Sequence, residues 1–114
     1  MNRLLLAIVA LSLPATAAAH AMLEHAEPSA GAQLSASPKQ LRLDFSEPLE
    51  PAFSGVSITD SAGHSVANGA PAISGTNMTV SLKSVAPGEY RVQWHAVSVD
   101  THRTEGSYSF TVGP

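Results

Sequence analysis

The sequence has 114 residues, of which 44% are hydrophobic and 13% are charged, and its formal net charge at pH 7 is −3. This length suffices for one small domain, and a mildly acidic chain with only 6 lysines and arginines is a poor candidate for binding nucleic acid. The absence of cysteine excludes disulfides and thiolate metal sites such as blue copper centres.

The first predicted element is a secretory signal peptide over residues 1–19. Arg3 supplies a positive charge, an apolar stretch runs from Leu4 to Leu13, and the alanines at 17–19 form a small-residue cleavage site. The apolar stretch is too short to span a bilayer. We therefore expect residues 20–114 to be an exported domain that begins with His20. Cleavage two residues earlier, which would leave Ala18 first, is the alternative.

The rest of the chain alternates apolar and polar residues with a period of two and shows no helical stripe, which is typical of half-buried strands. Turn residues such as Asn68-Gly69 and Pro87-Gly88 separate the alternating stretches. About seven short strands in one small domain predict an all-β fold, a Greek-key sandwich or small barrel. The predicted strands are Met22–Glu27, Leu41–Phe45, Val56–Thr59, His64–Val66 (a weak one), Met78–Leu82, Tyr90–Ala96 and Gly106–Val112.

His20 is the first candidate metal ligand. As an N-terminal residue it would offer its free amine and an imidazole nitrogen to the same ion, which no internal histidine can do. A terminal amine has a reference pKa of about 7.7–8.0, so a metal ion can displace its proton near neutral pH. The alternative is a frayed terminal residue with no role as a ligand.

Asp100 and His102 form the second candidate feature, between the two last predicted strands. If this segment is extended, their side chains point to the same side of the backbone. Together with His20 they would supply an amine, two imidazoles and a carboxylate, a set of nitrogen and oxygen donors that suits Cu(II) in tetragonal geometry. Taken alone, the pair is also typical of a solvated loop, and zinc is a competing metal.

Other titratable residues are weaker candidates. Glu47 follows a predicted strand, where it would be a further oxygen ligand, an acceptor for a coordinated imidazole or an exposed carboxylate. His25 is either an auxiliary ligand or a surface histidine. We expect His95 to face away from Trp94, and His64 to be solvated in a turn.

The chain resembles the CopC family of small periplasmic copper-binding proteins. The combination of an N-terminal histidine with a later Trp…Asp-x-His block is the specific part of this resemblance. The similar segments follow one another through nearly all of the predicted mature chain: His20–Leu23, Pro28–Gly31, Leu43–Glu47, Gly88–Trp94, Val97–His102 and Gly106–Phe110.

The resemblance implies a seven-stranded Greek-key β-sandwich or barrel of immunoglobulin-like or cupredoxin-like type. It also implies one Cu(II) per chain, held by the amine and imidazole of His20, the imidazole of His102 and the carboxylate of Asp100, with Glu47 near the metal in some relatives. Some members have a second site, for Cu(I), in a loop rich in methionine and histidine. Here residues 51–71 contain no methionine and only His64, so we expect a protein that binds Cu(II) alone.

The family also implies a role in copper sequestration, resistance or delivery in the periplasm, often alongside a CopD-type copper importer in the inner membrane. We expect a soluble monomer without enzymatic activity. One rival function is an oxidative enzyme, because an N-terminal histidine and a second histidine also form the copper brace of polysaccharide monooxygenases. In that case Asp100 would occupy a coordination position that such enzymes keep open. The other rival is an immunoglobulin-like interaction module that binds no metal.

Overall fold

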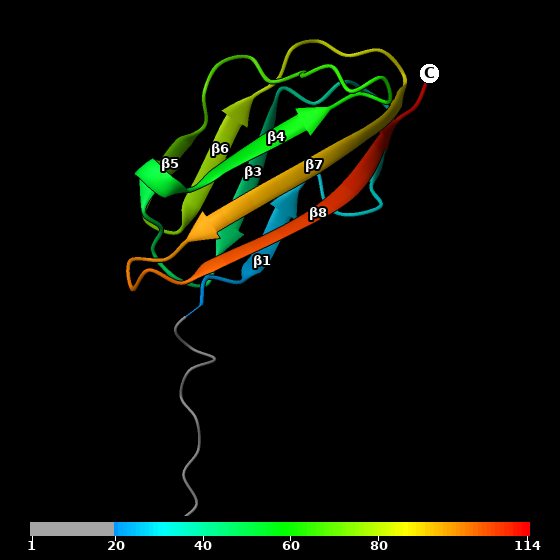
Figure 1. Ribbon diagram of the computed structural model, residues 1–114. Coiled ribbons are helices and arrows are strands. Elements are labelled where there is room, and N and C mark those ends of the chain that lie inside the picture. The colour runs from blue at the N-terminus through cyan, green and yellow to red at the C-terminus, as the bar shows by residue number, and fades with distance from the viewer. Residues whose placement is uncertain (1–19) are drawn as a thin grey trace, which may run out of the picture.

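Two four-stranded sheets pack face to face in the computed structural model, which describes residues 20–114 (Figure 1). The strand order is β1–β3–β6–β5 in one sheet and β2–β8–β7–β4 in the other. Within residues 20–114, no helix is long and apolar enough to cross a membrane. The elements are β1 (Leu23–Glu27), β2 (Gln33–Leu34), β3 (Gln40–Phe45), the 3-10 turn η2 (Pro51–Phe53), β4 (Gly55–Thr59), β5 (Ala72–Ser74), β6 (Asn77–Ser81), β7 (Gly88–Val97) and β8 (Arg103–Val112).

The longest ladder joins β7 and β8, which pair antiparallel from Gly88 opposite Val112 to Val97 opposite Arg103. All other neighbours are antiparallel as well, except β2, which runs parallel to β8. Because β7 and β8 pair over their whole length, the loop between them is short and fixed at both ends. This loop contains Asp100 and His102.

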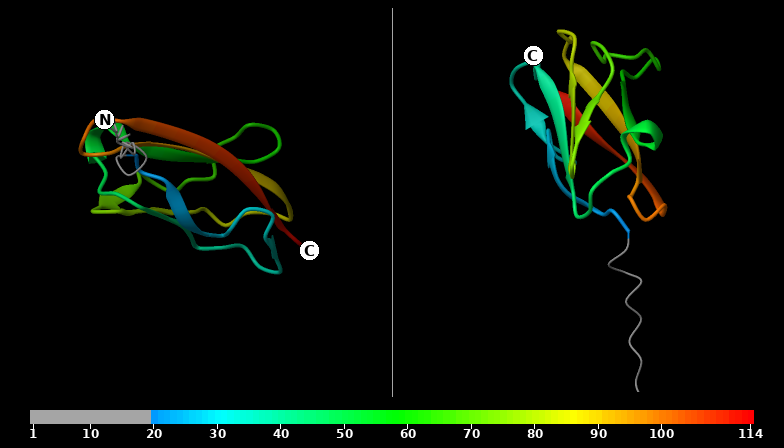
Figure 2. Two further views of the ribbon diagram at one scale, coloured as in Figure 1. Left: turned by 90° about the horizontal axis from the view of Figure 1, so that it is seen from below. Right: turned by 90° about the vertical axis from the view of Figure 1, so that its left-hand side faces the viewer.

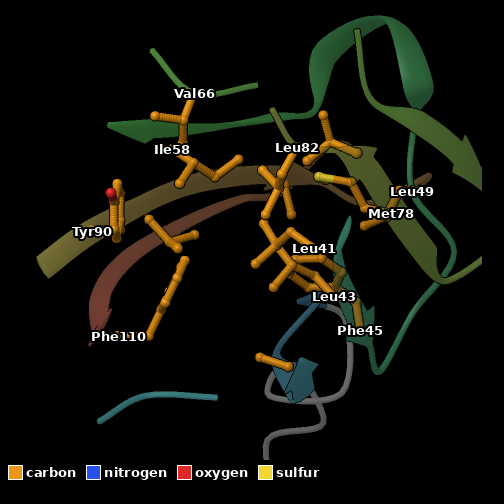
Figure 3. Close-up of a cluster of buried hydrophobic side chains, with 14 of the residues drawn as sticks. Leu41, Leu43, Phe45, Leu49, Ile58, Val66, Met78, Leu82, Tyr90 and Phe110 are labelled. Atoms are coloured by element: carbon orange, nitrogen blue, oxygen red, sulfur yellow. The ribbon is translucent and has the colours of Figure 1, made fainter. Parts of the chain in front are cut away.

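The core lies between the two sheets, where alternate residues of each strand point inward (Figure 3). In β3, Leu41, Leu43 and Phe45 are buried while Arg42 between them is exposed. A half-buried strand places every second side chain on one face, so this alternation directs each apolar side chain of β3 into the core. The facing sheet contributes Ile58, Tyr90, Val92, Ala96, Phe110 and Val112.

The predicted all-β sandwich is confirmed, with eight strands where about seven were expected. The prediction of a weak strand at His64–Val66 is wrong, since this stretch makes only an isolated bridge between Thr59 and Ser65. β2 and β5 were missed because two or three residues are too few to show alternation. β8 begins at Arg103, earlier than expected, because the antiparallel ladder continues through Gly106 to the end of β7.

One end of the sandwich gathers segments that are far apart in the sequence. β1 and β8 begin there, and β3 and β7 end there, at the lower end of the molecule in Figure 1 and in the right-hand view of Figure 2. The beginning of the described chain therefore lies beside the β7–β8 loop. The topology thus brings His20 to the same end as Asp100 and His102.

Candidate metal centre

The imidazole rings of His20 and His102 stack on each other, with ring centroids 4.5 Å apart and an angle of 20° between the planes. His20 is partly buried, and the side chain of His102 is 54% exposed. The two histidines come from opposite ends of the described sequence, so only the tertiary fold brings them into contact. The sequence predicts that these two residues share a site, and the fold brings their rings into contact.

The β7–β8 loop is a turn, so the condition of extended backbone, under which Asp100 and His102 would point to the same side, is not met. The amide of Thr101 donates to the carbonyl of Ser98 at 2.8 Å, and the amide of Ser98 donates to the carbonyl of His102 at 3.0 Å. Thr101 has a φ of 77°, in the left-handed region that β-branched residues rarely adopt. The turn nevertheless brings the two side chains together, with Asp100 Oδ1 3.4 Å from His102 Nδ1.

Hydrogen bonds favour the ionised form of Asp100. The hydroxyl of Ser98 donates to Asp100 Oδ1, and the backbone amide of His102 lies 3.4 Å from the same oxygen. The bond from Ser98, helped by His102, holds the pKa of Asp100 below its ordinary value. A carboxylate that stays ionised is the form that can bind a cation.

These contacts also distinguish the donor atoms. Within the described residues, the contacts of the two side chains in the loop are made by Oδ1 of Asp100 and Nδ1 of His102. Oδ2 of Asp100 and Nε2 of His102 lie outside that network and are the atoms with which these side chains would bind a metal. An imidazole whose other nitrogen faces a carboxylate has a fixed orientation, which is a common arrangement around protein-bound metals.

Among residues 20–114, no three His, Cys, Asp or Glu side chains lie in an arrangement that could hold a metal ion. For His20 and His102 the reason is the stacking of their rings. The nitrogen lone pairs of an imidazole lie in the plane of its ring, so two nearly parallel rings do not direct their lone pairs to a common metal position. A shared ion requires one ring to turn. In the 114-residue chain the nitrogen of His20 is also an amide, which becomes an amine only when the bond after Ala19 is cleaved.

Glu47 lies beside the β7–β8 loop rather than within the group of His20, Asp100 and His102. It precedes Pro48, whose carbonyl accepts a hydrogen bond from the amide of Val99 at 3.2 Å. Its side chain is partly buried. This hydrogen bond brings the residue after Glu47 against the β7–β8 loop, and the role of Glu47 as a ligand stays a prediction.

The remaining histidines are outside this centre. His25 on β1 is 59% exposed and faces Glu27 at 3.7 Å. His64 is 79% exposed, with Nδ1 3.5 Å from Asp60, as expected for a solvated turn. His95 lies over Gly55, whereas Trp94 packs edge-on against Phe45 in the core with ring centroids 5.2 Å apart, so the two face opposite sides of β7.

Three hydroxyl side chains near the centre were missed by the sequence analysis: Ser46, Ser98 and Thr104. Ser98 is 1% exposed. Serine and threonine are common throughout the chain, and no spacing in the sequence distinguishes these three from the others. Only their contacts with the segments that carry His20 and Asp100 do so.

Comparison with known proteins identifies the family. The family model for the CopC domain matches residues 23–113. The chain is 40% identical to Protein YobA of Escherichia coli K12, over 96% of this chain and 93% of that protein. It is 33% identical to the copper transport protein CutJ of Bacillus subtilis, over 96% of this chain but 21% of that longer protein. The crystal structure of CopC from Methylosinus trichosporium OB3b superposes with a TM-score of 0.77 at 38% identity, covering 83% of this chain and 95% of that one. On this evidence, the chain belongs to the CopC family.

Proposed function

We propose that residues 20–114 form a periplasmic protein that binds one Cu(II) ion and holds it for sequestration, resistance or delivery. The ligands are the amine and imidazole of His20, the imidazole of His102 and the carboxylate of Asp100. The contact between His20 and His102 carries this proposal, because it joins two nitrogen donors that the sequence separates widely. Nitrogen and oxygen donors of this kind suit Cu(II).

The amine depends on removal of residues 1–19, which lie outside the described residues. We infer that this segment is a signal peptide cleaved after Ala19, because a charged start, an apolar stretch and small residues follow in the required order. Cleavage in the exported protein gives His20 two donors, its amine and its imidazole. Because both belong to one residue, binding of the second donor costs little additional conformational entropy. The function is coordination of the metal rather than turnover of a substrate.

Delivery is one form of this function, and the relatives include both copper transport and copper resistance proteins. The stretch of CutJ that this chain matches makes up 21% of a longer copper transport protein. We infer that this domain works as a monomer and passes copper to a CopD-type importer. Half-exposed ligands such as His102 suit this role, because an acceptor must reach the ion to take it.

A competitive Cu(II) titration of the exported, processed protein tests the proposal. We expect tight binding of one Cu(II) per chain, and an N-terminal mass that begins with His20. His102→Ala should weaken binding by about two orders of magnitude or more, since it removes a directly coordinating nitrogen and the effect should exceed that of a supporting residue. His64→Ala is the matched control, because His64 is exposed and contacts only its own turn through Asp60.

Unchanged affinity in His102→Ala would remove this residue from the site. If a protein that begins with His20 bound no Cu(II), the proposed function would be wrong. An N-terminal mass beginning at Ala18 would instead identify the cleavage site as the error.

A further inference from the structure

The first described residues, 20–22, are held on the sandwich by Ser46, which directly follows β3. The amide of Ser46 donates to the carbonyl of Met22 at 2.9 Å, and the amide of Met22 donates to Ser46 Oγ at 2.8 Å. The same hydroxyl donates to the carbonyl of His20 at 3.3 Å. Ser46 therefore makes contacts on both sides of Ala21.

The hydroxyl of Thr104 holds Ala21, the residue between His20 and Met22. Thr104 Oγ1 donates to the carbonyl of Ala21 at 2.7 Å, and Ala21 is completely buried. Thr104 belongs to β8 and comes two residues after His102. A side chain from the strand that follows His102 thus fixes the backbone that carries His20.

Terminal residues are poorly ordered unless something ties them down. Once residues 1–19 are removed, His20 would be such a residue, and an ion that bound it would have to order it first. Ligands that are already held near their bound positions avoid most of that cost. The three hydrogen bonds of Ser46 and the one of Thr104 supply such ordering before any metal arrives.

We propose that Ser46 and Thr104 are positioning residues that hold the N-terminal segment so that the amine and imidazole of His20 meet the nitrogen of His102. This inference rests on the proposed Cu(II) site. Neither residue contacts the metal in this proposal; each acts through the backbone of residues 20–22. Residues that support metal ligands in this way typically change affinity by about 10–100-fold when they are replaced.

The test compares Cu(II) affinity of the processed wild-type protein with that of Ser46→Ala and Thr104→Val. We expect each variant to bind roughly 10-fold more weakly and to give an altered Cu(II) electron paramagnetic resonance spectrum. Ser46→Thr and Thr104→Ser retain the hydroxyl and should restore both readouts. Ser57→Ala and Thr111→Val remove exposed hydroxyls from β4 and from β8 itself, and they are the matched controls.

Thermal unfolding of the metal-free variants separates positioning from folding, because a loss of affinity in a protein that still unfolds cooperatively is local to the site. Should a variant not fold, hydrogen exchange of the Met22 amide in the wild type decides: slow exchange supports the proposal and fast exchange overturns it. Unchanged affinity and spectra in both variants would also overturn it while leaving the Cu(II) site intact. Failure of the wild type to bind Cu(II) would instead remove the proposed function.

Discussion

The carboxylate of Asp100 accepts a hydrogen bond from Ser98, a residue that is far less exposed than Asp100. Ser98 is 1% exposed, whereas the Asp100 side chain is 40% exposed. An exposed carboxylate in a loop normally samples several rotamers, each of which would have to be given up on binding a metal. The buried hydroxyl of Ser98 fixes one oxygen of this carboxylate through its hydrogen bond. Ser98 thus links the rigid end of β7 to a candidate ligand.

Ser98→Ala tests this link. Loss of the donated hydrogen bond should raise the pKa of Asp100 toward its ordinary value, because that bond is the largest cause of the lowering. A lowered carboxyl pKa contributes stability above the unfolded-state pKa, and this contribution is lost as pH falls through the folded-state pKa. In the variant this contribution should therefore be smaller, and its loss should be complete at a higher pH. Titration of Asp100 by NMR in the metal-free protein measures the shift.

Ser57→Ala serves as the control for this experiment, since Ser57 is exposed on β4. An Asp100 titration curve that is the same in Ser98→Ala and in the wild type would contradict the assignment. We also expect Cu(II) affinity to fall by about 10-fold in Ser98→Ala, as for other residues that support a metal ligand.

At the level of the strands, the pairing of β7 with β8 determines the shape of the core beneath the candidate centre. Trp94 on β7 lies opposite Gly106 on β8, and its indole ring covers this glycine. A Cβ atom on Gly106 would lie only 2.6 Å from Cζ2 of Trp94. Trp94 also packs against Phe45 of the other sheet, so its ring has little freedom to move. The glycine is thus required by packing rather than by backbone conformation.

Gly106→Ala should consequently destabilise the fold by about 1–3 kcal/mol, the usual cost of overpacking a core. The free energy of unfolding from urea titration measures this effect. Gly55→Ala is the matched control: its Cβ would meet the His95 ring at 3.0 Å, but that ring lies on the outer face of β7 and can turn away. Equal losses in the two variants would show that core packing against Trp94 is not the cause.

At the level of the whole molecule, the candidate centre exists only because the sandwich brings its first residues beside the β7–β8 loop. Ala21, the second of the described residues, is already part of the core. Folding should therefore not depend on whether anything precedes His20. Metal binding should depend on it strongly, because an amide nitrogen replaces the amine when the chain is longer.

A processed protein whose His20 amine is acetylated tests this separation of folding from binding. We expect its thermal unfolding without metal to match that of the unmodified processed protein. Its Cu(II) affinity should fall by orders of magnitude, since it loses the amine that is one of four proposed donors. Equal affinities of the acetylated and unmodified processed proteins would show that the amine of His20 is not a ligand.

The sequence alone determined the fold class and the donor types of the candidate centre. Period-two alternation in stretches such as Leu41–Phe45 and Tyr90–Ala96 is a local pattern, and burial on one face of a strand produces it directly. The small-residue site before His20 and the Asp-x-His block are also contiguous in sequence, so both could be recognised there. The strands β2 and β5 could not be recognised in the sequence, because their two or three residues become strands only by pairing with the longer strands β8 and β6.

Only the tertiary structure decided how the candidate ligands meet and what holds them. Stacking of His20 on His102 results from sheet topology, which the alternation pattern leaves open. The β7–β8 loop forms a turn that is closed by hydrogen bonds within residues 98–102, and Thr101 adopts a positive φ there. The contacts of Ser46 and Thr104 join segments that are distant in the chain, and hydrogen bonds between such residues leave no periodicity in the sequence to detect.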